Sequence, residues 1–153
     1  MKQHILFIIA LLSAAAPVCA DDSIAVGIRA GGAAGRSSYS TEVFGELYLN
    51  RLVSIGATLG YTIIDRDNKQ SVKRDEAVPI TALFKAHAPF PVIKPYAGLG
   101  QALIFHNDRG TKGSVVGLAG VDIPIGPFFL NAEYRRQLDD RLDILAGGVG
   151  TRF

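Results

Sequence analysis

The sequence predicts an all-β protein, an eight-stranded antiparallel up-and-down transmembrane β-barrel. Three observations carry this prediction. The chain begins with an apolar export segment, the remainder alternates between apolar and small or polar residues in eight segments, and the last residue is an aromatic, Phe153. Strands of a membrane barrel alternate between a lipid face and a lumen face, and aromatic residues flank the apolar band.

The first 20 residues have the pattern of a secretory signal peptide. Lys2 precedes an apolar run at 5–16, and small residues lead to a cleavage site after Ala20. The run is shorter than the roughly 20 residues that a membrane-spanning helix needs. We therefore predict a signal peptide over 1–20 and one barrel domain over 21–153. The single cysteine, Cys19, lies in the signal peptide, so the barrel domain has no disulfide and no thiol chemistry.

Eight segments alternate as a membrane barrel requires, namely residues 23–34, 41–50, 53–64, 77–88, 94–105, 114–123, 128–136 and 142–153. The first sets aliphatic side chains against Arg29 and small residues. The second sets valine and leucine against two glutamates and two aromatic residues. The third is the clearest, because six apolar residues oppose serine, threonine and glycine, as a lipid face opposes a lumen face. The fourth has Pro79 near its start, where a strand tolerates proline.

The fifth segment is ambiguous about which face is the lumen face. Gln101 shares one face with Leu99 and Leu103, whereas the other face contains Tyr96 and Ile104. We place Gln101 in the lumen, because an amide that is exposed to lipid at mid-membrane lacks hydrogen-bond partners and is costly.

The last three segments keep the alternation. The sixth sets aliphatic residues against Asp122, and the seventh places Glu133 on the lumen face. The eighth presents Leu145, Val149 and Phe153 on one face. We expect Phe153 to lie at the membrane boundary and to close the barrel against the first strand, and we expect these three residues to form a terminal assembly signal.

The connections differ in length. Short turns are predicted at 50–52, 89–93 and 124–127, and longer polar loops at 35–40, 65–76 and 106–113, with a short fourth loop at 137–141. Short periplasmic turns alternate with longer outer loops in membrane barrels. An even number of strands then places both termini on the periplasmic side.

Five short stretches resemble a known family. They are 78–81 (VPIT), 94–100 (KPYAGLG), 120–124 (GVDIP), 131–135 (NAEYR) and the ending 148–153 (GVGTRF). The chain is similar in these stretches to the small eight-stranded outer-membrane proteins that include the OmpA transmembrane domain, OmpX and OmpW-like barrels. The resemblance implies a location in the cell outer membrane, contact with its lipid, and insertion by the barrel assembly machinery.

The resemblance is specific for architecture rather than for activity, because one fold can carry many functions. The family includes structural proteins, adhesion and invasion factors, narrow pores, channels for hydrophobic compounds and lipid A modifying enzymes. We expect a monomer with a structural or surface-interaction role and without a cofactor, and the alternative is a narrow channel for small or hydrophobic solutes. Without Lys2 the chain keeps 15 basic and 14 acidic residues, a balance that indicates no nucleic-acid partner.

Charged residues recur on the predicted lumen faces. They are Arg29, Glu46, Lys85, Asp122, Glu133, Arg135 and Arg152. Because the two signs are nearly balanced, we expect these side chains to pair across a lumen that is just wide enough for side chains to fill. The alternative is a gated narrow pore, in which a pair such as Glu133 and Arg29 exchanges partners to admit water or ions.

Basic residues recur in the predicted outer loops. They are Arg66, Lys69, Lys73, Arg74, Arg109 and Lys112. Phosphates of lipopolysaccharide are natural partners for such cations. The alternative is a solvated loop of mixed charge, because acidic residues are interspersed.

Two other functional classes are alternatives. Lipid A deacylases of this barrel class carry a histidine and a serine close together on one strand, but the sequence places no serine or threonine near His87, and His106 has only Ser114 across a loop. We therefore predict no catalytic site, and no residue cluster has metal-ligand or dinucleotide-binding spacing. A soluble periplasmic barrel of lipocalin type is the other alternative, and it would need a polar exterior.

Overall fold

The computed structural model describes residues 24–34, 38–68, 71–107, 110–139 and 142–153. Its strands are β1 Ile24–Ala33, β2 Ser38–Tyr48, β3 Val53–Asn68, β4 Ser71–His87, β5 Lys94–His106, β6 Gly110–Ile125, β7 Phe128–Gln137 and β8 Leu142–Arg152. These strands follow the eight predicted segments in order, which confirms the all-β prediction. The signal peptide predicted at 1–20 lies outside the described residues.

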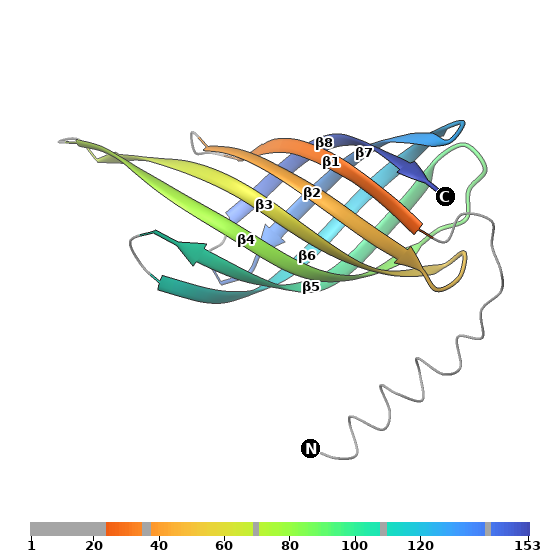
Figure 1. Cartoon of the computed structure of the whole chain (residues 1–153), viewed down its shortest axis with the longest axis horizontal. Helices are drawn as coiled ribbons and strands as arrows, with labels where there is room; N and C mark the ends of the chain where they lie inside the picture. Colours follow the sequence, from red (N-terminus) through yellow and green to blue (C-terminus); the bar gives the residue numbers. More distant parts are fainter. Residues whose placement is uncertain (1–23, 35–37, 69–70, 108–109, 140–141) are drawn as a thin grey trace, which may run out of the picture.

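The strands form one closed antiparallel barrel (Figure 1). Each strand pairs with its neighbours in sequence, and β8 pairs with β1. Ile24 and Phe153 exchange two backbone hydrogen bonds of 3.0 Å each at this seam. The prediction that the last residue closes the barrel against the first strand is therefore confirmed. A closed barrel leaves no edge strand, so its backbone groups are paired within the sheet, as hydrocarbon surroundings require.

The outer wall is apolar and the interior is polar. Strict alternation along β7 shows this, because Leu130 and Tyr134 face outward while Asn131, Glu133 and Arg135 are buried. A water-soluble lipocalin-type barrel has the opposite arrangement, with a polar exterior and an apolar interior. The outward apolar side chains thus support the membrane barrel over the soluble alternative.

No helix in the described part of the chain is long and apolar enough to cross a membrane.

At the end of the barrel that holds Ile24 and Phe153, the β2–β3 and β6–β7 turns are short, as predicted, whereas the β4–β5 connection takes up residues 88–93. In the turn between β2 and β3, the Asn50 side-chain oxygen accepts hydrogen bonds from the backbone amides of Leu52 and Val53, at 2.8 and 2.9 Å. Asparagine commonly stabilises turns in this way. Between β6 and β7, Gly126 has a φ of 61°, a conformation that favours glycine.

The prediction of longer loops at the opposite end is wrong. β3 and β4 continue through 65–76, so this segment is a paired hairpin that extends beyond the other strands (Figure 1). The register places Asp65 opposite Arg74. β2 and β6 also begin earlier than predicted, at Ser38 and Gly110. Polar composition alone did not distinguish a loop from an extended ribbon.

The inward placement of Gln101 is also wrong. Gln101 is exposed on the outer wall, and Tyr96, Ala102 and Ile104 of the same strand are buried in the lumen. Tyr96 decides the orientation of β5, because its phenol donates a hydrogen bond to the buried Glu133 at 2.8 Å. Alternation then directs Gln101 outward. The cost of exposing the Gln101 amide to lipid was a weaker constraint than the hydrogen bonds that Tyr96 makes inside the lumen.

Candidate functional site

Four charged side chains form a closed ring across the lumen. Arg29 of β1 contacts Glu133 of β7 at 2.5 Å and Glu42 of β2 at 2.7 Å. Arg135 of β7 contacts Glu133 at 2.6 Å and donates two hydrogen bonds to the Glu42 carboxylate, at 3.0 and 3.1 Å. The ring contains two positive and two negative groups, and it connects β7 with β1 and β2 through the interior of the barrel.

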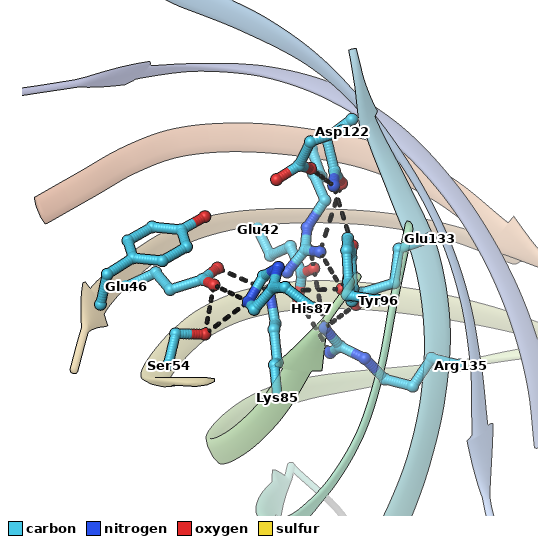
Figure 2. A network of polar contacts seen from close by, with 12 residues as sticks. Glu42, Glu46, Ser54, Lys85, His87, Tyr96, Asp122, Glu133 and Arg135 are labelled. Atoms are coloured by element: carbon cyan, nitrogen blue, oxygen red, sulfur yellow. Dashed lines mark hydrogen bonds and ion pairs between the residues drawn. The ribbon is translucent and has the colours of Figure 1, made fainter. Parts of the chain in front are cut away.

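A second group of polar side chains surrounds Glu46 of β2 (Figure 2). The ammonium of Lys85 lies 2.8 Å from Glu46 and 3.7 Å from Glu133, so this lysine links the second group to the ring. The Ser54 hydroxyl donates to Glu46 Oε1 at 2.5 Å. His87 Nε2 lies 3.0 Å from the same oxygen.

A third group of polar side chains connects the C-terminal strand to the ring. Arg152 contacts Asp122 at 2.7 Å. The Asn131 amide donates to Asp122 at 2.7 Å and to the phenol oxygen of Tyr96 at 2.8 Å. Tyr96 in turn donates to Glu133 at 2.8 Å. Polar contacts therefore run without a break from Arg152 to the ring.

Aromatic rings cover the cations of this network. The cation lies 4.5 Å from the ring centroid for Arg29 over Phe44 and for Lys85 over Tyr96, and 4.7 Å for Arg152 over Phe129. Such contacts contribute roughly 0.5–2 kcal/mol each, more when water is excluded. The aromatic side chains thus stabilise the charges and occupy the space beside them.

Bulky lumen side chains lie across glycines of the neighbouring strand. The facing pairs are Phe44 with Gly27, Tyr96 with Gly120, Phe129 with Gly150, and Arg29 with Gly148. A Cβ at any of these glycines would overlap the facing side chain. Gly148 of β8 has a particular role, because Arg29 of β1 passes over it to reach Asn131 of β7, with 3.3 Å between Nη1 and Oδ1. The ring therefore depends on a residue without a side chain.

The charged groups of the network are withdrawn from solvent. The side chains of Arg29, Lys85 and Glu133 are 0%, 3% and 2% exposed. A buried charge is stable only when it is paired. The interior of an eight-stranded barrel is of a size that side chains can fill, and these pairs and the adjacent aromatic rings lie inside it. Within the described ranges, no group of His, Cys, Asp or Glu is arranged to hold a metal ion.

The structure places all seven predicted lumen charges, including Arg29, Glu133 and Arg135, inside the barrel. They contact one another directly or are linked by shared partners. The prediction left out Glu42, although the alternation of its segment already put it on the lumen face. Tyr96 was missed because its strand was assigned the wrong inward face. Ser54, His87 and Asn131 were missed because only Asp, Glu, Lys and Arg were considered on the predicted lumen faces.

The sequence placed no serine near His87, but the fold brings Ser54 of β3 to it. The Ser54 hydroxyl lies 2.8 Å from His87 Nε2, and Glu46 contacts the same nitrogen. A catalytic triad needs its acid on the other ring nitrogen, yet His87 Nδ1 is buried without a hydrogen-bond partner in the described structure. Ser54 is also completely buried. Glu46, Ser54 and His87 therefore lack the arrangement of a catalytic triad.

The predicted surface and terminal residues have different outcomes. Arg66, Lys73 and Arg74 belong to the extended β3–β4 hairpin, and Lys112 is exposed on β6. Lys69 and Arg109 lie outside the described residues. Leu145, Val149 and Phe153 are 64%, 49% and 61% exposed on the outer wall of β8 and at its end.

The fold has counterparts among solved structures. Neisserial surface protein A is 18% identical, with a TM-score of 0.65 over 85% of this chain and 96% of that one. The N-terminal β-barrel domain of OprF from Pseudomonas aeruginosa is 20% identical, with a TM-score of 0.57 over 84% and 97%. The outer membrane enzyme PagL is 10% identical, with a TM-score of 0.51 over 84% and 98%.

These likenesses concern the fold, because all the identities are low. No protein-family model matches the chain, and a search of the curated proteins finds no relative. The closed eight-stranded barrel, its apolar outer wall and its structural neighbours nevertheless agree. The chain has the architecture of the small eight-stranded outer-membrane β-barrels.

Proposed function

We propose that this protein is a closed structural barrel of the outer membrane, which spans the membrane, holds the β3–β4 hairpin at the surface and performs no catalysis. The ring formed by Arg29, Glu42, Glu133 and Arg135 carries the proposal. It joins strands on different sides of the lumen through five contacts of 2.5–3.1 Å. Such a ring braces the barrel from within and blocks its interior.

The energetics of buried ion pairs support a sealed lumen. A solute that crosses the ring must separate at least one pair of charges that water does not reach. Removing one partner from a buried pair typically costs about 3–5 kcal/mol, and each ring carboxylate contacts two arginines. Opening the lumen therefore needs a rearrangement of several pairs together.

A gated narrow channel is the second candidate, and one observation favours it. Glu133 has three cationic neighbours, because Lys85 lies 3.7 Å away in addition to Arg29 and Arg135. Lys85 also contacts Glu46 at 2.8 Å. A lysine between two carboxylates can exchange one for the other, and this exchange would loosen one side of the ring.

The surface role that we propose is contact with lipopolysaccharide. Arg66, Lys73 and Arg74 belong to the hairpin that extends past the other strands (Figure 1), and Lys112 is exposed on β6. Arginine and lysine bind phosphate groups through charge-assisted hydrogen bonds. Replacing these four residues with glutamine should weaken binding of lipid A vesicles in a salt-dependent manner. Unchanged binding would contradict this part of the proposal.

Conductance in planar bilayers distinguishes the sealed barrel from the channel. The experiment uses the refolded protein, Glu133→Ala, and the control Asp143→Ala, whose carboxylate lies outside the lumen and contacts the half-exposed Arg136. Heat-modifiable gel mobility verifies that each variant is inserted. We expect no discrete current steps from the unmodified protein. Steps that Glu133→Ala alters and Asp143→Ala does not would instead establish the channel.

A further inference from the structure

Gln101 lies on the outer wall in the middle of β5, among apolar residues. Leu99 and Leu103 flank it along the strand, and Ala82 of β4 and Val115 of β6 are its register partners. All four are exposed on the same face, and none has a hydrogen-bonding side chain. The primary amide has two donors and one acceptor oxygen. Lipid hydrocarbon satisfies none of them, and each unsatisfied polar group costs several kcal/mol there.

We propose that Gln101 marks a self-association surface, at which two copies of this chain pair across a two-fold axis in the membrane. In an interface of this symmetry, the residue at the axis meets its own copy. Glutamine is suited to that position, because the amide of one copy donates to the carbonyl oxygen of the other and accepts in return. The oxygen and one of the two N–H donors of each amide are then paired without any other polar residue.

The outward side chains around Gln101 are small enough for a second barrel to approach closely. The outward residues of the neighbouring positions are small, namely Ala82, Ala86, Ala97, Gly117 and Ala119. Ala86, Ala97 and Ala119 follow one another in register across β4, β5 and β6. Small residues allow two membrane-embedded surfaces to pack at short distance.

Leu99 supplies a matching projection. It is 65% exposed and lies two positions from Gln101 on the same face of β5. A two-fold axis near Gln101 would direct Leu99 of each copy onto the alanine and glycine surface of the other. The outer wall thus contains a protruding side chain, Leu99, and a surface of alanine and glycine against which the Leu99 of a second copy could pack. It also contains the self-complementary amide of Gln101.

Other polar groups on the described outer wall differ from Gln101 in their surroundings. The Tyr134 hydroxyl, for example, donates a hydrogen bond to Asp143 at 2.7 Å. Arg136 of β7 and Thr151 of β8 lie near the ends of their strands, where the polar headgroup region begins. Lipid headgroups reach such positions, but not the middle of a strand. Gln101 therefore needs a protein partner in the hydrocarbon layer. The sequence predicted Gln101 in the lumen and a monomeric protein. Gln101 instead faces outward, and on this basis we propose a dimer in place of the monomer.

Sedimentation equilibrium in detergent micelles tests the proposal on the refolded protein and on Gln101→Leu. Leucine preserves the apolar character of the wall, so Gln101→Leu should fold into a barrel with unchanged heat-modifiable mobility. We expect the unmodified protein to dimerise. We expect Gln101→Leu to weaken the dimer by about tenfold, which corresponds to about 1.4 kcal/mol, because two reciprocal amide hydrogen bonds are lost together.

Cysteine cross-linking locates the interface independently. Residues 21–153 contain no cysteine, so Ala82→Cys introduces a single thiol beside Gln101, and the control Ala30→Cys introduces one on β1, across the barrel. Oxidation in phospholipid vesicles should produce dimers from Ala82→Cys and few from Ala30→Cys. A protein that stays monomeric in vesicles would overturn the proposal and leave Gln101 to a different membrane protein. A dimer that Gln101→Leu does not weaken would overturn it as well.

Discussion

Arg135 and Arg136 are adjacent on β7, and the same substitution at each should have very different effects. Arg135 points into the lumen, where it contacts Glu42 through two hydrogen bonds and Glu133 at 2.6 Å. Arg136 points outward, is 50% exposed and lies 3.8 Å from Asp143. The pair compares a buried and an exposed ion pair at neighbouring positions of one strand.

The magnitude follows from the contacts that are lost. Arg135→Gln leaves the ring of ion pairs with two carboxylates and one arginine, so one buried negative charge loses its partner. Such a loss costs about 3–5 kcal/mol, and the nearby Lys85, 3.7 Å from Glu133, should hold the value toward the lower end. Arg136→Gln removes a long contact at the surface, which contributes about 0–1 kcal/mol.

Urea unfolding in lipid vesicles measures the difference. The chain contains no tryptophan, so loss of the barrel is followed by heat-modifiable gel mobility and by circular dichroism. With a urea dependence of about 1–3 kcal/mol per molar, Arg135→Gln should lower the midpoint by about 1 M or more. Equal shifts for the two variants would refute the reasoning, because the ring would then contribute no more than a surface contact.

Two further predictions concern a glycine and a surface carboxylate. Gly148→Ala should destabilise the barrel by about 1–3 kcal/mol, the usual cost of overpacking, because its Cβ would overlap Arg29. At Gly147, a Cβ would have only a backbone oxygen nearby, at 3.8 Å, so Gly147→Ala is the control. The unfolding midpoints of the two variants provide the comparison, and equal midpoints would contradict the prediction. The carboxylate of Asp139 accepts a hydrogen bond from the Val115 amide at 2.9 Å, and this bond lowers the pKa of Asp139. The resulting stabilisation is present above the unfolded pKa near 3.9 and is lost as the pH falls through the lower folded value, so protection of the Val115 amide from hydrogen exchange should decrease with acid in the unmodified protein and not in Asp139→Asn.

The charged ring shows how far the sequence could lead. Alternation alone places Arg29, Glu133 and Arg135 on lumen faces, because a period of two residues assigns each side chain to one face. Which of these charges contact one another could not be predicted from alternation. Arg29 reaches Glu133 across β8 because Gly148 is in register with Arg29, and register depends on how neighbouring strands align.

Two predictions were wrong because each considered one segment without the strands that pair with it. For a single strand, only the composition of its two faces indicates which face is inside. For β5 the cost of an exposed Gln101 indicated the wrong face, because the partners of Tyr96 on β7 were not visible in that strand. For 65–76 the mixed charges suggested a loop, and only the pairing of Asp65 with Arg74 and its neighbours shows a hairpin.

The sequence by itself determined the strand number, the apolar wall and the charged character of the lumen. Each of these follows from local alternation and from the environment that a strand requires on either side. Only the tertiary structure decided which charges form the ring, which glycines accommodate the large side chains, that Ser54 lies beside His87, and that Gln101 faces outward. Those features arise between strands that are distant in sequence, and the register that aligns them is set by the packing of the whole closed barrel.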